Sequence, residues 1–222
     1  RSQDIELGGQ GAPLVPIGEK LLFRGYDAFL NLGGFSNVSK ISDKSLIAYD
    51  ICAVNTILNF LANKRRKSYD LNGNMAKQGK LILPLFDDLE SLEYYKKSPP
   101  KSLGIEWVNS KILPLLEKYR LQSVEDLLYT YTIHIGSLIS KNFDCGQNVL
   151  VTGGGAKNNF LIKKIKENQF ANFILPSEII IDYKESIIFG FLGVLRLRNE
   201  INCLASVTGS SRDHCSGNIF IP

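Results

Sequence analysis

The chain contains 222 residues, of which 44% are hydrophobic and 22% are charged, and its formal net charge is +4. These are ordinary globular values, and the length allows one large domain or two small ones with a hydrophobic core. The basic residues are dispersed and not interleaved with base-stacking aromatics, which argues against nucleic acid as a partner. The longest apolar run, 187–195, is too short to span a bilayer and no signal peptide is recognisable, so we expect no membrane partner.

The first part of the chain predicts a lead-in followed by a three-stranded meander. Residues 1–25 contain glycine and proline and are expected to be irregular. Three short strand-like runs follow, separated by turn-rich residues of hairpin length, which favours antiparallel pairing. These strands are predicted at 27–32, 35–41 and 45–50. A helix at 54–64 comes next, with its apolar residues on one face.

The second part of the chain predicts helices and then alternating strands and helices. Residues 68–106 mix short helical stretches with loops, and 107–119 predicts a helix that Pro114 kinks or breaks. Ser123 begins the clearest helix, because Ser-Val-Glu-Asp is a capping pattern. The remaining elements are predicted as strand 148–152, helix 158–168, strand 172–181 and helix 184–199.

This order of elements predicts an α/β fold with a mixed sheet and helices on both faces. Three antiparallel strands are followed by helices and then by alternating strands and helices. The same order is found in one lobe of actin/hexokinase-like (ribonuclease H-like) kinases. Residues 26–222 are expected to form this lobe.

Two glycine segments are candidate ligand sites. Gly153, Gly154 and Gly155 lie between a short strand and a helix, where bare backbone N–H groups could meet a phosphate or nucleotide. A tight strand-to-helix turn is the simpler explanation, and the spacing matches neither a Walker loop nor the dinucleotide fingerprint. Gly33 and Gly34 could likewise approach a phosphate, or simply form a hairpin turn.

Two carboxylates are candidate site residues, each with a structural alternative. Asp50 ends an apolar strand just before a helix, so it could act as a general base in a cleft or cap that helix. Glu185 lies in segment 182–185, which we expect to open the last long helix. Acids at a helix start are stabilised by the helix dipole, whether or not they face a cleft.

The cysteines indicate a reducing compartment. Cys52, Cys145, Cys203 and Cys215 form no Cys-x-x-Cys pair, which argues against a zinc site and a disulfide framework. Reduced thiols are typical of a cytoplasmic protein. The consecutive residues 213–215, Asp-His-Cys, are expected to form a plain loop, because three adjacent residues rarely converge on one ion.

Eight short motifs occur in register along essentially the whole chain. They are Gly8-Gly-Gln-Gly-Ala-Pro-Leu14, Asn31-Leu-Gly-Gly-Phe-Ser-Asn37, Tyr49-Asp50 with Asn55, Tyr69-Asp-Leu-Asn-Gly73, Pro99-Pro-Lys-Ser-Leu-Gly104, Val151-Thr-Gly-Gly-Gly-Ala156, Glu185 and Ser206-Val-Thr-Gly209. Together these motifs closely resemble the C-terminal part of anhydro-N-acetylmuramic acid kinases. The loop 50–55 departs from the family's common Asp-Thr-Gly-Pro-Gly-Asn, although its first and last residues are kept, so the loop shape is expected to differ.

The resemblance implies a kinase of peptidoglycan recycling. Such enzymes convert 1,6-anhydro-N-acetylmuramic acid, ATP and water to N-acetylmuramic acid 6-phosphate and ADP, with Mg²⁺. It implies that Asp50 is the catalytic base that activates water and that Asn55 and Glu185 bind the sugar, with no protein metal ligand assigned. The implied nucleotide-binding residues are Asn31, Gly33, Gly34, Gly153, Gly154, Gly155 and Ala156.

The resemblance also implies that a further lobe belongs to the enzyme. The family's N-terminal lobe carries a Gly-Thr-Ser-x-Asp-Gly phosphate loop that this sequence lacks, and the chain begins with Arg1. Residues 1–25 are therefore expected to lead in from that lobe, the chain alone to have little kinase activity, and the enzyme to form a homodimer. The alternatives are an inactive half-domain that binds nucleotide or amino sugar, and an actin-fold kinase for another sugar.

Overall fold

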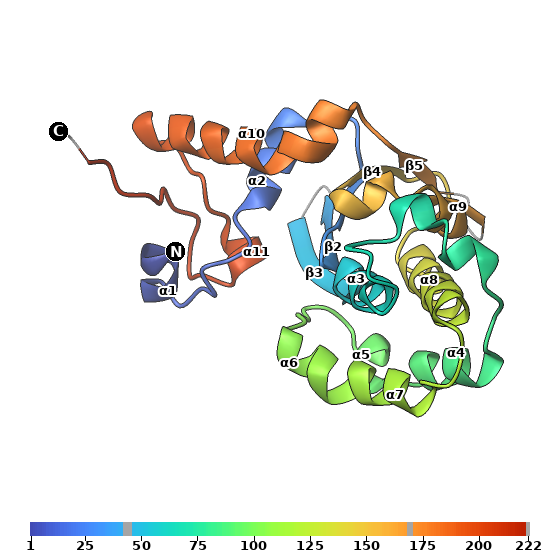
Figure 1. Cartoon of the computed structure of the whole chain (residues 1–222). Helices are drawn as coiled ribbons and strands as arrows, with labels where there is room; N and C mark the ends of the chain where they lie inside the picture. Colours follow the sequence, from blue (N-terminus) through green and yellow to red (C-terminus); the bar gives the residue numbers. More distant parts are fainter. Residues whose placement is uncertain (42–45, 168–170, 221–222) are drawn as a thin grey trace.

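A five-stranded mixed sheet forms the centre of the molecule, in the order β3-β2-β1-β4-β5 (Figure 1). The computed structural model describes residues 1–41, 46–167 and 171–220. The strands are β1 (Ala28–Leu32), β2 (Phe35–Ile41), β3 (Leu46–Ala53), β4 (Asn148–Thr152) and β5 (Asn172–Ile174). The first three pair antiparallel, whereas β4 is parallel to β1 and β5 is parallel to β4. The predicted α/β fold class is thus confirmed, although Ser45 of the predicted third strand lies outside the described residues.

The main hydrophobic core lies between one face of the sheet and three helices. These helices are α3 (Asn55–Asn63), α8 (Val124–Ser140) and α9 (Asn159–Glu167). Alternation in β1 directs Ala28, Leu30 and Leu32 into this core, where all three are fully buried. Ser123 caps α8 as predicted, since its hydroxyl accepts a hydrogen bond from the Asp126 N–H at 3.0 Å.

Short helices follow α3 in the chain, and those labelled at the bottom of Figure 1 cover the lower edge of this core. They are the 3₁₀ turns η1 (Leu71–Gly73) and η2 (Ala76–Gln78), then α4 (Leu83–Glu90), α5 (Glu93–Lys96), α6 (Ile105–Trp107), the π-helical turn η3 (Val108–Ile112) and α7 (Leu113–Lys118). Pro114 lies in the first turn of α7, directly after the π turn. The predicted interruption at this proline therefore takes the form of a widened turn.

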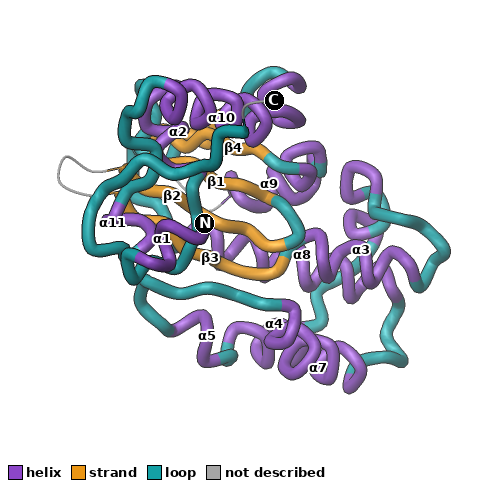
Figure 2. Tube along the Cα trace, turned by 90° about the vertical axis from the view of Figure 1, so that its left-hand side faces the viewer, coloured by secondary structure: helices purple, strands orange, loops and turns teal. Residues whose placement is uncertain are grey.

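A second group of helices lies over the opposite face of the sheet (Figures 1 and 2). It consists of α1 (Ser2–Glu6), α2 (Val15–Leu22), α10 (Glu178–Leu197) and α11 (Ala205–Thr208). Ile17 of α2 packs against Ile188, Leu192 and Leu195 of α10 in a separate small core. No helix of the described residues is both long enough and apolar enough to cross a membrane.

The structure corrects two expectations for these segments. Residues 1–25 contain α1 and α2, so the lead-in is not wholly irregular. The predicted strand 172–181 stops at Ile174, and helix α10 begins at Glu178 instead of residue 184. The run Ile179-Ile-Ile181 has high strand propensity, but it continues into a helix whose apolar residues pack on α2. That tertiary packing overrides the local propensity.

Candidate active site

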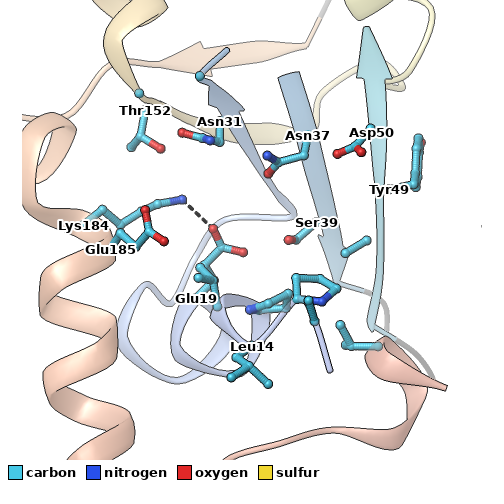
Figure 3. Close-up of a pocket in the computed structure, with 18 of the residues that line it drawn as sticks. Leu14, Glu19, Asn31, Asn37, Ser39, Tyr49, Asp50, Thr152, Lys184 and Glu185 are labelled. Atoms are coloured by element: carbon cyan, nitrogen blue, oxygen red, sulfur yellow. Dashed lines mark hydrogen bonds and ion pairs between the residues drawn. The ribbon is translucent and has the colours of Figure 1, made fainter. Parts of the chain in front are cut away.

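Four polar residues form a row across four neighbouring strands (Figure 3). Thr152 of β4 is opposite Asn31 of β1, Asn31 is opposite Asn37 of β2, and Asn37 is opposite Asp50 of β3. Directly opposed residues project from the same face of a sheet. With strands about 4.8 Å apart, this row extends over roughly 14 Å.

The row forms one wall of a cavity of about 830 Å³. The facing wall comes from α2 and α10, which contribute Glu19, Lys184 and Glu185 (Figure 3). The row lies within the strands, since β3 continues past Asp50 to Ala53, and it borders the cavity together with two helices from distant parts of the chain. A cavity of this size accommodates a small-molecule ligand.

Asp50 is held rigidly in this wall by the segment that precedes α6. Its Oδ2 accepts a hydrogen bond from the Leu103 N–H at 2.8 Å. Its backbone N–H donates to the Lys101 carbonyl at 3.1 Å, and its carbonyl accepts from the Tyr94 hydroxyl at 2.8 Å. Burial raises the pKa of the Asp50 carboxyl above its ordinary value of 3.8, and the Leu103 hydrogen bond only partly offsets this. The result is a fixed, more basic carboxylate at a cavity wall.

Asp50 does not cap the following helix. The N–H groups at the start of α3 are bound by carbonyls of the β1–β2 hairpin: Val54 and Thr56 donate to Gly34 at 2.8 and 3.2 Å. The N–H of Asn55 donates to the Gly33 carbonyl at 3.2 Å. Because the hairpin satisfies the helix start, the Asp50 side chain is free to face the cavity. Of the two alternatives for Asp50, helix capping is therefore removed.

A buried ion pair crosses the lower part of the cavity. Lys184 Nζ lies 2.5 Å from Glu19 Oε1, and their side chains are only 6% and 4% exposed. The ammonium also lies 5.7 Å from the centre of the Phe29 ring. The pair ties α10 to α2 and fixes the wall that faces the strand row, as the dashed line in Figure 3 shows.

Thr152 has an unused hydroxyl at the cavity wall. The residue is 1% exposed, and its Oγ1 has no hydrogen-bond partner among the described residues. A buried hydroxyl without a partner is costly. This atom therefore indicates a polar ligand group or a water molecule in the cavity. Thr152 and Asn37 stand out in the sequence only as members of motifs, because the direction of their side chains depends on strand pairing.

Two of the three consecutive glycines are required by packing. Gly153 has φ 84° and ψ 166°, a backbone region that is essentially restricted to glycine. A Cβ there would lie 2.5 Å from Asn31 Oδ1, and a Cβ on Gly155 would lie 2.8 Å from Leu32 Cβ. Gly154 differs, since its nearest contact would be Asn55 Nδ2 at 3.7 Å. The tight-turn explanation therefore covers two of the glycines, and Gly154 alone has space beside it.

Gly154 also contributes to a second cavity, of about 670 Å³, on the other side of the loop. Ala156 and Asn55 line this second cavity, together with residues of the segment 69–72. The Asn55 side chain donates to the Leu32 carbonyl at 3.1 Å. The structure thus places Asn55 beside the second cavity, apart from Asp50 and Glu185.

The other predicted residues divide between the two cavities and the framework. Asn31, Gly33 and Gly153 line the first cavity, whereas Gly34 is exposed outside both cavities and Gly155 is buried against Leu32. Glu185 lies in the second turn of α10 and not at its start, so the helix-dipole explanation for it is wrong. Its neighbour Asp182 pairs with Lys157 at 2.6 Å.

The amino-acid sequence of this chain matches a known protein family. A family model described as anhydro-N-acetylmuramic acid kinase matches residues 1–222. The chain is 32% identical over 244 residues to the anhydro-N-acetylmuramic acid kinase of Haemophilus influenzae, a match that covers 99% of this chain and 64% of that protein. The corresponding Bacillus cereus protein is 32% identical over 247 residues, covering 100% and 64%. The chain thus spans about 64% of the length of these curated relatives.

A solved structure also shares the fold. The activator of the 2-hydroxyisocaproyl-CoA dehydratase from Clostridium difficile with bound ADPNP superimposes with a TM-score of 0.50, at 14% identity. The match covers 83% of this chain and 66% of that chain, and it shows a similarity of fold alone. The family, by contrast, is shown by the match of its model to residues 1–222: the chain belongs to the anhydro-N-acetylmuramic acid kinase family.

Proposed function

We propose that the protein containing this chain is an ATP-dependent kinase that opens 1,6-anhydro-N-acetylmuramic acid with water and phosphorylates O6. The products are N-acetylmuramic acid 6-phosphate and ADP. The observation that carries the proposal is Asp50, a rigid carboxylate with a raised pKa in the wall of the 830 Å³ cavity. Family membership supports the choice of substrate.

The first half of the reaction is a ring opening at the anomeric carbon. Asp50 accepts a proton from a water molecule, and the water oxygen attacks that carbon. The bridging bond to O6 then breaks. This resembles half of an inverting glycoside hydrolysis, in which a carboxylate base activates water on the face opposite the leaving oxygen. Glu185 faces Asp50 across the cavity and is assigned to bind the sugar.

The second half is phosphoryl transfer, which depends mainly on positioning. The freed O6 attacks the γ-phosphate of ATP. Gly154 lines both cavities, so we assign the adenosine to the second cavity and the phosphates to the space beside Asn31 and Gly33. The loop from Gly153 to Ala156 lies between the two parts of the nucleotide in this arrangement.

One carboxylate of the first cavity fits a magnesium ion. Mg²⁺ in phosphoryl-transfer sites is bound by one or two carboxylates together with phosphates and water. Glu19 and Asp182 already pair with lysines and Asp50 is the proposed base, so Glu185, which has no basic partner among the described residues, could hold the ion beside the sugar. Mg²⁺ would neutralise charge on the transferred phosphoryl group.

The proposal is tested with Asp50→Asn in the protein that includes the rest of the relatives' length. The amide keeps the size of the side chain but cannot accept the proton, so sugar-dependent ADP release should fall at least about 100-fold. ATP affinity, measured by calorimetry, should stay nearly unchanged. Asp87→Asn, the same change on an exposed carboxylate of α4, should leave turnover intact. Full activity of Asp50→Asn would remove the base from the proposal.

Substrate choice and the need for further chain are tested separately. The anhydro-amino sugar should support ADP release, while glucose and N-acetylglucosamine should not. We propose that residues 1–222 alone have little activity and that the additional lobe, fused or supplied in trans, restores it. No activity in either arrangement would instead favour a binding half-domain. The cytoplasmic location and the homodimer stay predictions.

A further inference from the structure

Three buried side chains from distant parts of the chain converge beside α1. They are Asp4, Cys203 and His214, and one potential ligand atom from each lies within 4.8 Å of the others. Asp4 and Cys203 are 199 positions apart in the sequence. None of the three lines the cavities described above. The cluster is therefore separate from the proposed active site.

The backbone holds two of these residues side by side. Cys203 and His214 form an antiparallel bridge, in which the Cys203 N–H donates to the His214 carbonyl at 3.0 Å. The His214 N–H donates back to the Cys203 carbonyl at 3.1 Å. The neighbours of His214 have other roles: Asp213 Oδ1 accepts from the Ala205 N–H at 2.8 Å, and Cys215 Sγ is 4.0 Å from Arg196. Residues 213–215 thus point to different partners, as expected from the sequence, and His214 instead lies beside Asp4 and Cys203.

The histidine ring has one nitrogen without a partner. His214 Nδ1 lies 3.2 Å from the Arg212 carbonyl oxygen, which can only accept, so Nδ1 carries the proton. In the neutral ring Nε2 is then a bare lone pair. It is buried, 3.5 Å from Asp4 Oδ1, and has no hydrogen-bond donor among the described residues. A backbone carbonyl that fixes the histidine tautomer in this way is typical of metal sites.

We propose that Asp4, Cys203 and His214 form a binding site for Zn²⁺, with water as the fourth ligand. Imidazole nitrogen, thiolate sulfur and carboxylate oxygen are the ligands that Zn²⁺ takes in proteins. Tetrahedral bonds of about 2.0–2.3 Å put a ligand nitrogen roughly 3.3 Å, and a ligand sulfur roughly 3.5 Å, from a ligand oxygen. The corresponding separations from Asp4 Oδ1 are 3.5 Å for His214 Nε2 and 3.3 Å for Cys203 Sγ. The two edges that meet at Asp4 thus already have tetrahedral lengths.

Binding requires one proton to leave the site. Cys203 is a thiol that donates to Asp4, and burial raises its pKa to about 12. When the metal–sulfur bond forms, the S–H bond breaks and the proton goes to solvent, while Asp4 and His214 bind without losing a proton. The pKa of Asp4 is already low: burial would raise it, but hydrogen bonds from Thr208 and the Gly11 N–H more than offset this.

The proposed site joins the N-terminal and C-terminal segments of the chain beside the first cavity. Asp4 Oδ2 accepts from the Gly11 N–H at 2.7 Å, and the Gln10 N–H donates to the Thr208 carbonyl at 2.9 Å. Gln10 and Val207 line the first cavity. A metal that joins Asp4 to Cys203 and His214 would therefore fix this end of the cavity wall without contacting the substrate.

Cobalt substitution tests the proposal directly. The purified protein is stripped with a chelator and titrated with Co²⁺, whose thiolate complex gives a charge-transfer absorption. One equivalent should produce the band, release one proton and be displaced by Zn²⁺. Cys203→Ser should remove the band, and both Cys203→Ser and His214→Gln should weaken Zn²⁺ binding by at least about 100-fold. The matched control is Cys215→Ser, which should retain both the band and the affinity.

A thermal measurement guards against variants that fail to fold. Zn²⁺ should raise the Tm of the unmodified protein and of Cys215→Ser, because a ligand that binds the folded state stabilises it, but not that of folded Cys203→Ser. If the unmodified protein gives no band at one equivalent, or if folded Cys203→Ser keeps it, the proposal is overturned. The proposal is also overturned if NMR shows that the His214 imidazole is protonated and that Zn²⁺ does not change its signals. His214 would then form a simple ion pair with Asp4.

Discussion

The three consecutive glycines can be separated by single alanine substitutions, because the structure assigns them different surroundings. Gly153→Ala places a side chain in a backbone region that costs roughly 1–3 kcal/mol for residues other than glycine. The added Cβ also meets Asn31 Oδ1 at 2.5 Å and the Leu32 backbone at 2.8 and 2.9 Å. Such overpacking costs about 1–3 kcal/mol. The free energy of unfolding should therefore fall by at least about 2 kcal/mol.

Gly154→Ala is the matched comparison. Its Cβ would meet only Asn55 Nδ2, at an ordinary 3.7 Å, so the free energy of unfolding should change by less than about 0.5 kcal/mol. Urea denaturation measures both variants. With an m-value of about 2 kcal/mol/M, Gly153→Ala should lower the midpoint by about 1 M and Gly154→Ala by less than about 0.25 M.

A second measurement at Gly154 tests the proposed position of the nucleotide. Gly154→Val should leave the fold intact but project a branched side chain between the two cavities, and it should raise the Kd for ATP at least about tenfold, or about 1.4 kcal/mol. Equal destabilisation by alanine at 153 and 154 would refute the packing argument. Unchanged ATP affinity in a folded Gly154→Val protein would refute the nucleotide argument.

Three further predictions concern titratable groups. Lys184→Met should lower the free energy of unfolding by about 3–5 kcal/mol, because it leaves Glu19 buried without its partner. Adding Glu19→Leu should recover most of that loss, and urea denaturation measures both variants. Burial lowers the pKa of His134 below its ordinary 6.5. The contribution of His134 to the free energy of unfolding is therefore present above pH 6.5 and is lost as pH falls through the lowered pKa. Denaturation at several pH values should show this slope, and an identical slope in His134→Gln would contradict it. The Asp50 base must be ionised, so kcat/KM should fall as pH decreases through a pKa above 3.8, and an acid limb at or below that value would exclude Asp50.

Local sequence determined much of the framework. Ser123 and its capping pattern predicted the start of α8, and the apolar residues on one face of segment 54–64 predicted helix α3. These predictions were correct because hydrogen bonds and side-chain periodicity within a few residues decide such features. The wrong boundary of α10 shows the limit, since Ile179–Ile181 continue into a helix that packs on α2 through Ile188, Leu192 and Leu195.

The site depended on pairings between residues far apart in the chain. Register between strands, including the irregularity between Ser36 and Asn37, sets Thr152, Asn31, Asn37 and Asp50 in one row. A one-residue slip would turn each side chain to the other face, and nothing local specifies the register of the parallel β1–β4 pair. The sequence by itself thus determined most of the elements and the family, and it made Asp50 a candidate base. Tertiary structure alone decided that hairpin carbonyls cap α3 and leave that carboxylate to the cavity, because only packing brings β1, β3 and α3 together.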